Sequence, residues 1–343
     1  MVHERQPSAA NDQAAARFWD REAVAQTLKT WMAHPAIQAY INIAFSGSPS
    51  IGKFETFLAF LHGRTFARGL SVGCGTGGLE RALLAHGVCE QIDAFDGSPE
   101  SLRIAREEAA KAGAADRVHY FAADFNEPRL PPAAYDIVFV NQAMHHVAKL
   151  EKLYRAILRT LKPDGLLYLD EYIGPSRHDW TDDNFARHRA VYDALPTRVR
   201  LEPVLPFPIQ VDDPSEAIRS SEIIAKLQVG FDVIARVDYG GTLLAPLYPF
   251  IEPEDAVVER LIEIEREWLR NGAPSYYTTL VAKPKEPRFL ASARYFVVPK
   301  LKRIAREITR SGSPAPPSLS SCPPTPPSSP RGSAGGTRGG RSA

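Results

Sequence analysis

Cysteine is scarce in this sequence of 343 residues, which contains only Cys74, Cys89 and Cys322 and no C-x-x-C pair. This number and spacing indicate neither a disulfide framework nor a zinc site. Long hydrophobic runs are also lacking: none approaches the roughly 18 apolar residues of a membrane span. The polar N-terminus has no apolar signal-peptide core. We therefore expect a soluble cytoplasmic protein without stable membrane insertion.

An excess of charge of one sign is missing as well. The chain has 41 Lys and Arg residues against 40 Asp and Glu residues, a formal net charge of +1. Such a balance gives no general argument for a nucleic-acid partner. The hydrophobic content of 44% and the charged content of 24% are ordinary for globular proteins, so a sizeable core can be buried.

Short apolar runs alternate with amphipathic helical patterns through the middle of the chain. The alternation predicts a doubly wound, mostly parallel α/β sheet of seven strands. The expected strands are 68–72, 91–95, 117–123, 135–142, 166–172, 231–241 and 276–284. The helices expected between them are 79–87, 98–113, 149–161 and 253–272, with a turn at 162–165.

Helical patterns at 11–33 and 51–63 precede the first strand, so residues 1–64 are expected to form an N-terminal helical cap. The main domain then covers 65–286. Its insertion, 174–230, lacks a clear period until a helix at 214–227, for which Ser215 is a plausible cap. A long insertion in this place is where a lid or substrate-binding element would lie.

Two segments follow the main domain. Residues 287–310 carry seven Lys or Arg against one Glu, which predicts a solvated terminal helix, with contact to an anionic membrane or a partner as the alternative. Residues 311–343 contain 23 Pro, Ser or Gly out of 33. This composition predicts disorder and no chemistry.

The stretch SVGCGTGGLERALLAHG places four glycines within six residues, between the first strand and its helix. Glycines permit positive φ and let a ligand approach the backbone closely. Gly73, Gly75 and Gly78 match the dinucleotide fingerprint G-x-G-x-x-G, and Asp96 follows 18 residues later. Gly73, Gly75 and Gly77 equally fit G-x-G-x-G, which resembles the S-adenosylmethionine loop of class I methyltransferases. The loop by itself leaves both ligands open.

Four further motifs separate the two ligands. DGSPESL at 96–102 and AADF at 122–125 resemble the second and third motifs of the class I methyltransferases. YDIVFVNQAMHHV at 135–147 and LKPDGLLYLDEY at 161–172 resemble the family's fourth and fifth strands. Together they identify a resemblance to the S-adenosylmethionine-dependent methyltransferases over about 65–173. An NAD-dependent oxidoreductase would not account for these motifs.

The resemblance implies S-adenosylmethionine as the cofactor and an antiparallel last strand. In the family the acid at Asp96 binds the ribose hydroxyls, the acid at Asp124 faces the adenine amino group and the residue at Phe125 packs on the ring. The cofactor-binding residues implied in this way are Gly73, Gly75, Gly77, Asp96, Ser98, Asp124, Phe125 and Asn141.

Ser71 departs from the family, which usually has an acid there for the methionine ammonium group. The Asn141 carbonyl or a polar group of the N-terminal helices is expected to compensate. Asp164 replaces the second glycine of the L-K-P-G-G turn, a substitution that a positive-φ position tolerates.

Candidate catalytic residues follow the fourth and fifth strands, at the edge where open α/β sheets bind ligands. His146 is the favoured general base and His145 lies beside it, with a positioning role for the pair as the alternative. Glu171 is expected to bind the acceptor, act as base or cap a helix. Asp170, Glu171 and His146 are one conceivable Mg²⁺ set, but no recognisable metal spacing is present, and no metal is expected.

Other residues have two interpretations each. Side chains of the insertion either grip an anionic or sugar acceptor or pack within a lid; these are Arg177, His178, Trp180 and Arg219. The apolar run 240–251 is either an acceptor wall or core, and Trp19 either closes over the cofactor or packs.

The favoured function is O-methylation of a small molecule, the acceptor being a sugar, glycolipid or secondary metabolite. Asn141-Gln142 is not the N-P-P-Y or D-P-P-Y signature of base methylation, so no nucleic acid is expected as acceptor. The alternatives are a non-catalytic binding module with this fold, which only Ser71 supports, and the oxidoreductase.

Overall fold

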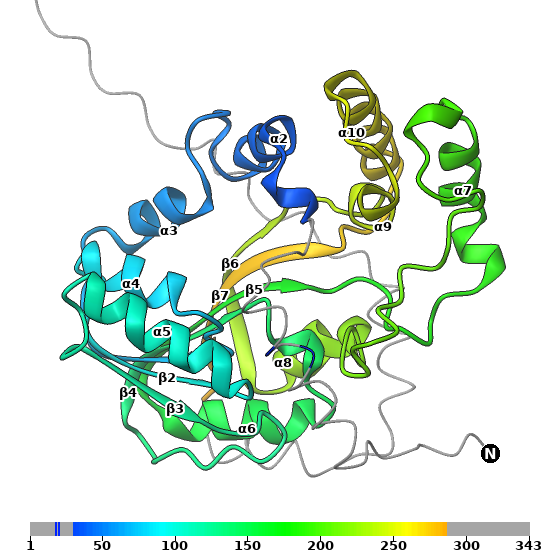
Figure 1. Cartoon of the computed structure of the whole chain (residues 1–343). Coiled ribbons are helices and arrows are strands. Elements are labelled where there is room, and N and C mark those ends of the chain that lie inside the picture. The colour runs from blue at the N-terminus through cyan, green and yellow to red at the C-terminus, as the bar shows by residue number, and fades with distance from the viewer. Residues whose placement is uncertain (1–17, 19, 21–29, 287–343) are drawn as a thin grey trace, which may run out of the picture. The chain divides into compact units, whose positions relative to one another are not determined.

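The computed structural model describes residues 18, 20 and 30–286. Its centre is a seven-stranded sheet of order β3-β2-β1-β4-β5-β7-β6 (Figure 1). Strands β1 to β5 pair in parallel, and β7 runs antiparallel to both of its neighbours. The strands are β1 Phe66–Val72, β2 Cys89–Asp96, β3 Val118–Ala122, β4 Tyr135–Asn141, β5 Leu161–Tyr172, β6 Phe231–Asp238 and β7 Tyr277–Pro284. The predicted strand number and the antiparallel last strand are confirmed.

Helices cover both faces of the sheet and form a lobe beside it. They are α2 Pro35–Ser46, α3 Lys53–Leu61, α4 Gly78–Ala85, α5 Pro99–Lys111, α6 Leu150–Thr160, α7 Asp182–Asp193, α8 Ile223–Gly230, α9 Leu244–Leu247 and α10 Asp255–Arg270. The 3-10 turns are η1 Trp31–Ala33, η2 Met144–His146, η3 Thr197–Val199, η4 Ser220–Glu222 and η5 Tyr248–Phe250.

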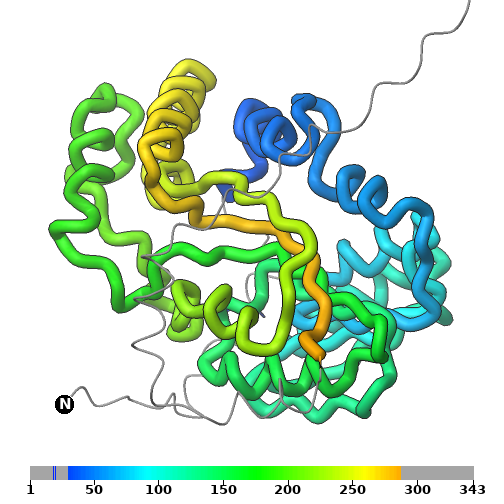
Figure 2. Tube along the Cα trace, turned by 180° about the vertical axis from the view of Figure 1, so that it is seen from behind, coloured from blue at the N-terminus to red at the C-terminus, as the bar shows by residue number. Residues whose placement is uncertain are grey.

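Three hydrophobic clusters correspond to this arrangement. One lies between the sheet and α6 with α8, and a second between the opposite face and α3, α4 and α5. The third joins α2, α7, α9 and α10 into a helical lobe on one side of the sheet, visible in Figure 1 and from behind in Figure 2. Leu243, Leu244 and Leu247 are fully buried in this lobe, so the apolar run 240–251 is core.

Two helices were missed by the sequence analysis although their signals are present. In α2, Pro35 occupies the first turn, Gly47 ends the helix at φ 74, and the buried residues follow a helical spacing. In α7 the buried positions are Phe185, His188 and Tyr192. The middle position is a histidine, which reads as polar in a sequence and so conceals the apolar stripe.

Two predicted details are wrong. Ser215 caps no helix: the segment expected to be helical at 214–227 becomes helical only with η4 and then with α8, which begins at Ile223. The expected turn at 162–165 lies within β5: Leu161 pairs with Tyr135, Leu166 pairs with Ile137, and the four residues between them lie opposite a single residue of β4.

Several predictions lie outside the described residues. They concern most of the helix at 11–33 including Trp19, the basic segment 287–310 and the tail 311–343.

Candidate functional site

The glycine loop joins β1 to α4, and its glycines are required for two different reasons. Gly73, Gly75 and Gly77 have φ values of +71°, +51° and +78°, a region that side chains disfavour. A Cβ on Gly73 would lie 2.2 Å from the Cβ of Ala143, and one on Gly77 would lie 2.3 Å from the hydroxyl oxygen of Tyr120. At Gly75, no atom of the described residues lies within 4 Å of that position. The loop therefore presents open backbone at its middle glycine.

Asp96 ends β2 beside this open backbone. Its Oδ2 accepts a hydrogen bond from the Gly75 N–H at 2.9 Å, and its Oδ1 accepts one from Ser98 N–H at 2.9 Å. Burial raises the pKa of Asp96, against the opposing effect of these backbone donors. Ser98 caps α5 by accepting from Ser101 N–H, and its hydroxyl donates to Asp20 at 2.6 Å.

Three further residues predicted to bind the cofactor are Phe125, Asp124 and Asn141, and Phe125 lies next to the glycine loop. The ring of Phe125 approaches the Cβ position of Gly73 to 3.7 Å, and its centroid is 5.8 Å from that of Phe95. Asp124 accepts from the Asn126 N–H at 2.7 Å. Asn141 ends β4 and pairs in register with β5.

Glu80 is a residue that the sequence analysis missed. It lies in the first turn of α4 and is fully buried. Burial raises the pKa of its carboxyl to about 7, while the Ser71 hydroxyl acts in the opposite direction. Neither carboxylate oxygen has a well-formed hydrogen bond in the described part of the chain. A buried acid without such bonds is costly to the fold, and this one lies beside the position where the expected acid is absent.

The histidine pair follows β4 in η2, and Glu171 of β5 is hydrogen-bonded to this turn and to the first histidine. Glu171 Oε2 accepts from the Ala143 N–H at 2.9 Å and from the Met144 N–H at 2.5 Å. Its Oε1 is hydrogen-bonded to Nδ1 of His145. Glu171 therefore fixes both the turn and the orientation of the first imidazole.

Glu216 of the insertion completes this group. Its Oε2 lies 3.6 Å from His145 Nε2 and 3.7 Å from His146 Nε2. A backbone hydrogen bond from the Ile218 N–H to the His145 carbonyl, 3.0 Å long, ties the insertion to η2. No sequence pattern pointed to Glu216, because 70 residues separate it from His146.

Charges determine how these groups titrate. Burial opposes protonation of His145, but Glu171 and Glu216 outweigh it and hold the pKa of His145 well above its usual range. Burial and the neighbouring His145 lower the pKa of His146. Burial raises the pKa of Glu216, but the two histidines outweigh it and bring the value to about 2.

The set of Asp170, Glu171 and His146 is not brought together. Strand alternation sends Asp170 to the face opposite Glu171, where it is fully buried. There it pairs with Lys53 of α3 and accepts hydrogen bonds from Tyr239 at 2.6 Å and Thr279 at 3.0 Å. Asp170 thus serves to attach α3 to the sheet.

Most of the insertion residues that were candidates for binding the methyl acceptor interact with other parts of the protein. Arg219 bonds to Glu151 and Glu222, Arg177 donates to backbone carbonyls, and Trp180 is buried in the helical lobe. His178 is exposed.

A cavity of about 710 Å³ opens where β5 gives way to the insertion. Its lining combines polar side chains, among them Asp179, Asp183, Arg187, Ser221 and Tyr276, with apolar groups that make up the larger part of the surface.

Comparison with known proteins agrees with this geometry. Residues 70–169, from β1 to β5, match the methyltransferase domain family. The chain carries a class I S-adenosylmethionine-dependent methyltransferase domain. The matched residues include the glycine loop, Asp96 and the histidine pair, and the match ends just before Asp170.

Two relatives differ in the atom that their names assign as acceptor. A sterol 24-C-methyltransferase of Eremothecium gossypii is 30% identical over 145 residues, covering 42% of this chain and 38% of the relative. A malonyl-[acyl-carrier protein] O-methyltransferase of Enterobacter lignolyticus is 36% identical over 113 residues, covering 33% of this chain and 42% of the relative. The chain thus spans less than half the length of each.

A solved structure resembles the whole methyltransferase domain. Geranyl diphosphate C-methyltransferase from Streptomyces coelicolor, in complex with Mg²⁺, geranyl diphosphate and S-adenosyl-L-homocysteine, aligns with a TM-score of 0.50 at 14% identity. The alignment covers 82% of this chain and 100% of that chain, and it supports the fold.

Within the described residues, no helix is both long and apolar enough to cross a membrane.

Proposed function

We propose that the protein transfers the methyl group of S-adenosylmethionine to a hydroxyl of a small molecule, such as a sugar, glycolipid or secondary metabolite. One juxtaposition carries the proposal. The glycine loop with Asp96 and the histidine pair with Glu171 all follow parallel strands of one sheet and lie at its carboxyl edge, where ligands of such sheets bind.

The residues at this edge fit the cofactor. Open backbone at Gly75 gives a close approach to the ligand, and the Asp96 carboxylate beside it suits the ribose hydroxyls. Phe125 lies next to the loop, where its ring would pack on adenine. Glu80, buried beside the Ser71 hydroxyl, would take the place of the acid missing at position 71 and pair with the methionine ammonium group.

When bound, S-adenosylmethionine would supply a methyl group on a sulfonium, and the acceptor oxygen would attack that methyl carbon in line, with S-adenosylhomocysteine as the leaving group. The oxygen forms the new bond to the methyl carbon, and the electrons of the broken bond remain on sulfur. Holding the two reactants in line accounts for much of such catalysis. An alcohol must also lose its proton, and the cluster of His145, His146 and Glu171 suits this need. The cluster therefore suits a hydroxyl acceptor, whose proton it would take up.

The acceptor class is supported by the cavity beside the insertion. Its carboxylates, Arg187, Ser221 and Tyr276 offer both hydrogen-bond donors and acceptors. Because apolar groups form the rest of the lining, it suits a small molecule that carries both hydroxyl and apolar groups.

Thermal shift measurements with S-adenosylmethionine, S-adenosylhomocysteine and NAD test the cofactor. A ligand that binds only the folded state raises the Tm, so the first two are expected to raise it and NAD is not. Stabilisation by NAD alone would reject the proposal.

Substitution of His146 tests the catalytic side. His146→Ala is expected to retain S-adenosylhomocysteine binding and to lose most turnover with labelled donor, by about 100-fold or more. Turnover is measured against panels of sugars, glycolipids and phenols. Unchanged turnover would remove His146 from the chemistry. Cofactor binding without turnover on any acceptor would instead support a binding module with this fold.

A further inference from the structure

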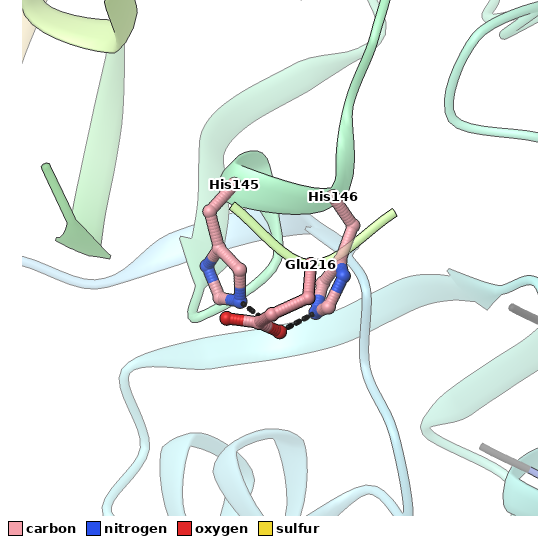
Figure 3. Close-up of side chains that lie close together, drawn as sticks. All are labelled: His145, His146 and Glu216. Atoms are coloured by element: carbon pink, nitrogen blue, oxygen red, sulfur yellow. Dashed lines mark ion pairs between the residues drawn. The ribbon is translucent and has the colours of Figure 1, made fainter. Parts of the chain in front are cut away.

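Three side chains with metal-binding atoms meet where η2 contacts the insertion. His145 and His146 come from η2, and Glu216 comes from the insertion (Figure 3). One ligand atom of each lies within 4.8 Å of the others. Both imidazoles present Nε2 to the same carboxylate oxygen of Glu216, at 3.6 and 3.7 Å. An ion with bonds of about 2.0–2.2 Å to nitrogen and oxygen needs these atoms only slightly closer together.

The opposite nitrogen of each imidazole has an acidic or hydroxyl partner. Nδ1 of His145 bonds to Glu171, whose other oxygen is held by two backbone N–H groups. Nδ1 of His146 lies 3.0 Å from Ser215 Oγ and 3.5 Å from Asp213 Oδ2. Metal-binding histidines typically have such a partner on the second nitrogen, because it fixes the tautomer and the direction of the ring. Here both rings are aimed at one point.

The charge of the cluster also favours a cation. Three carboxylates, those of Glu171, Asp213 and Glu216, surround two imidazoles, and the first two carboxylates are fully buried. Even with one imidazole protonated, the net charge of these five side chains is negative. Buried charges need a partner, and a divalent ion at the two Nε2 atoms and Glu216 would provide one.

We propose that His145, His146 and Glu216 bind a divalent transition-metal ion such as Zn²⁺, Mn²⁺ or Fe²⁺. Two imidazoles and one carboxylate suit this class, whereas Mg²⁺ and Ca²⁺ prefer oxygen ligands. Three protein ligands leave at least one position open. With the ion bound, both imidazoles are ligands, so the ion in place of a histidine base would polarise an acceptor hydroxyl at the open position, whose proton would pass to water. This use of the ion rests on the proposed function, but binding of the ion does not.

The test uses the tag-free full chain, stripped with a chelator and titrated with Co²⁺ and Zn²⁺ by absorption spectroscopy and calorimetry. One equivalent is expected to bind, with a Co²⁺ spectrum typical of mixed nitrogen and oxygen ligands. Glu216→Gln is expected to weaken binding by at least about 10-fold, and Glu171→Gln, which loses an orienting partner, by about 10-fold. His119→Gln removes an exposed histidine beside Asp93 and is expected to leave the affinity unchanged.

Each variant is checked for S-adenosylhomocysteine binding, which reports a folded cofactor site independently of the metal. If His145→Ala binds the metal ion as tightly as the wild type does, or if only His119→Gln loses metal binding, the proposed site is overturned. Specific metal binding that leaves turnover unaffected would overturn the role on the acceptor, but not the site. Failure to bind S-adenosylhomocysteine with intact metal binding would count against the proposed function alone.

Discussion

Ser71 and Glu80 are neighbours across the interface of β1 and α4, and the acid lies on the helix instead of the strand. In the resembling family the strand position carries the acid. Here the strand position carries a serine, whose hydroxyl interacts with the glutamate carboxyl of α4. The buried carboxyl, with a pKa of about 7, is then stabilised in its charged form when a cationic group binds beside it.

Exchange of the acid between the two positions tests this residue pair. Glu80→Gln is expected to weaken S-adenosylhomocysteine binding roughly 10-fold, equivalent to about 1.4 kcal/mol. Methylthioadenosine, which lacks the amino-acid portion, serves as control ligand and is expected to bind unchanged. Adding Ser71→Asp to Glu80→Gln restores the affinity. Calorimetry measures the affinity of the wild type, of Glu80→Gln and of the double variant for each ligand.

The pH dependence gives a second readout of the same pair. Wild-type binding is expected to strengthen as the pH rises through about 7, because only the carboxylate form of Glu80 pairs with the ammonium. Glu80→Gln loses this dependence. Equal weakening of both ligands would show that Glu80 only supports the loop.

At the scale of elements, α7 is attached to the lobe through a buried histidine. His188 Nε2 donates to the Thr242 carbonyl at 2.9 Å, and the ring stacks on Phe185 at 4.9 Å. Burial lowers the pKa of His188 from 6.5 to about 4. Between these values the unfolded chain binds a proton that the folded chain does not.

Acid should therefore loosen the lobe. The stability that His188 contributes is fully present above pH 6.5 and is lost as the pH falls from 6.5 to about 4, amounting to about 3 kcal/mol. His188→Gln is expected to remove this part of the pH dependence, as measured by urea unfolding at several pH values. His178→Gln, an exposed position in the same insertion, should retain it. Identical pH profiles for wild type and His188→Gln would contradict this account.

The short helix α9 depends on α10 in a similar way. The fully buried Glu265 accepts hydrogen bonds from the N–H groups of Gly241, Leu243 and Leu244, at 2.8, 2.8 and 2.9 Å. These N–H groups lie just before α9 or at its first residue. The N–H groups at the start of a helix have no partner within the helix, so the glutamate supplies one.

Removing this carboxylate is expected to be costly. Glu265→Ala leaves three buried donors unpaired and should lower the free energy of unfolding by about 3 kcal/mol or more. Glu263→Ala changes an exposed residue of the same helix and should cost less than about 0.5 kcal/mol. Urea unfolding compares the two, and similar costs would refute the anchoring role.

For the molecule as a whole, the sheet is complete when β7 ends at Pro284. The glycine loop, the histidine pair, Glu216 and the cavity all lie before that residue. A chain truncated after Glu286 is therefore expected to keep S-adenosylhomocysteine affinity and the Tm of the full chain. Loss of binding in the truncated chain, measured by calorimetry, would assign a role in the site to residues 287–343.

Local patterns were sufficient for the central sheet. The buried run of β4, the Ser98 cap of α5 and the glycine loop each act over a few neighbouring residues, so their structure could be predicted from the sequence. The lobe was harder to predict, because a buried histidine and a buried glutamate occupy positions in α7 and α10 that apolar residues normally mark.

The sequence by itself determined the doubly wound sheet, the cofactor class and the edge at which ligands bind, since periodicity and glycine geometry are short-range properties. Only the tertiary structure brought Glu80 beside Ser71, paired Asp170 with Lys53 and placed Glu216 against histidines 70 and 71 residues earlier. Those contacts depend on how helices and the insertion pack on the sheet, and packing joins residues without regard to their distance along the chain.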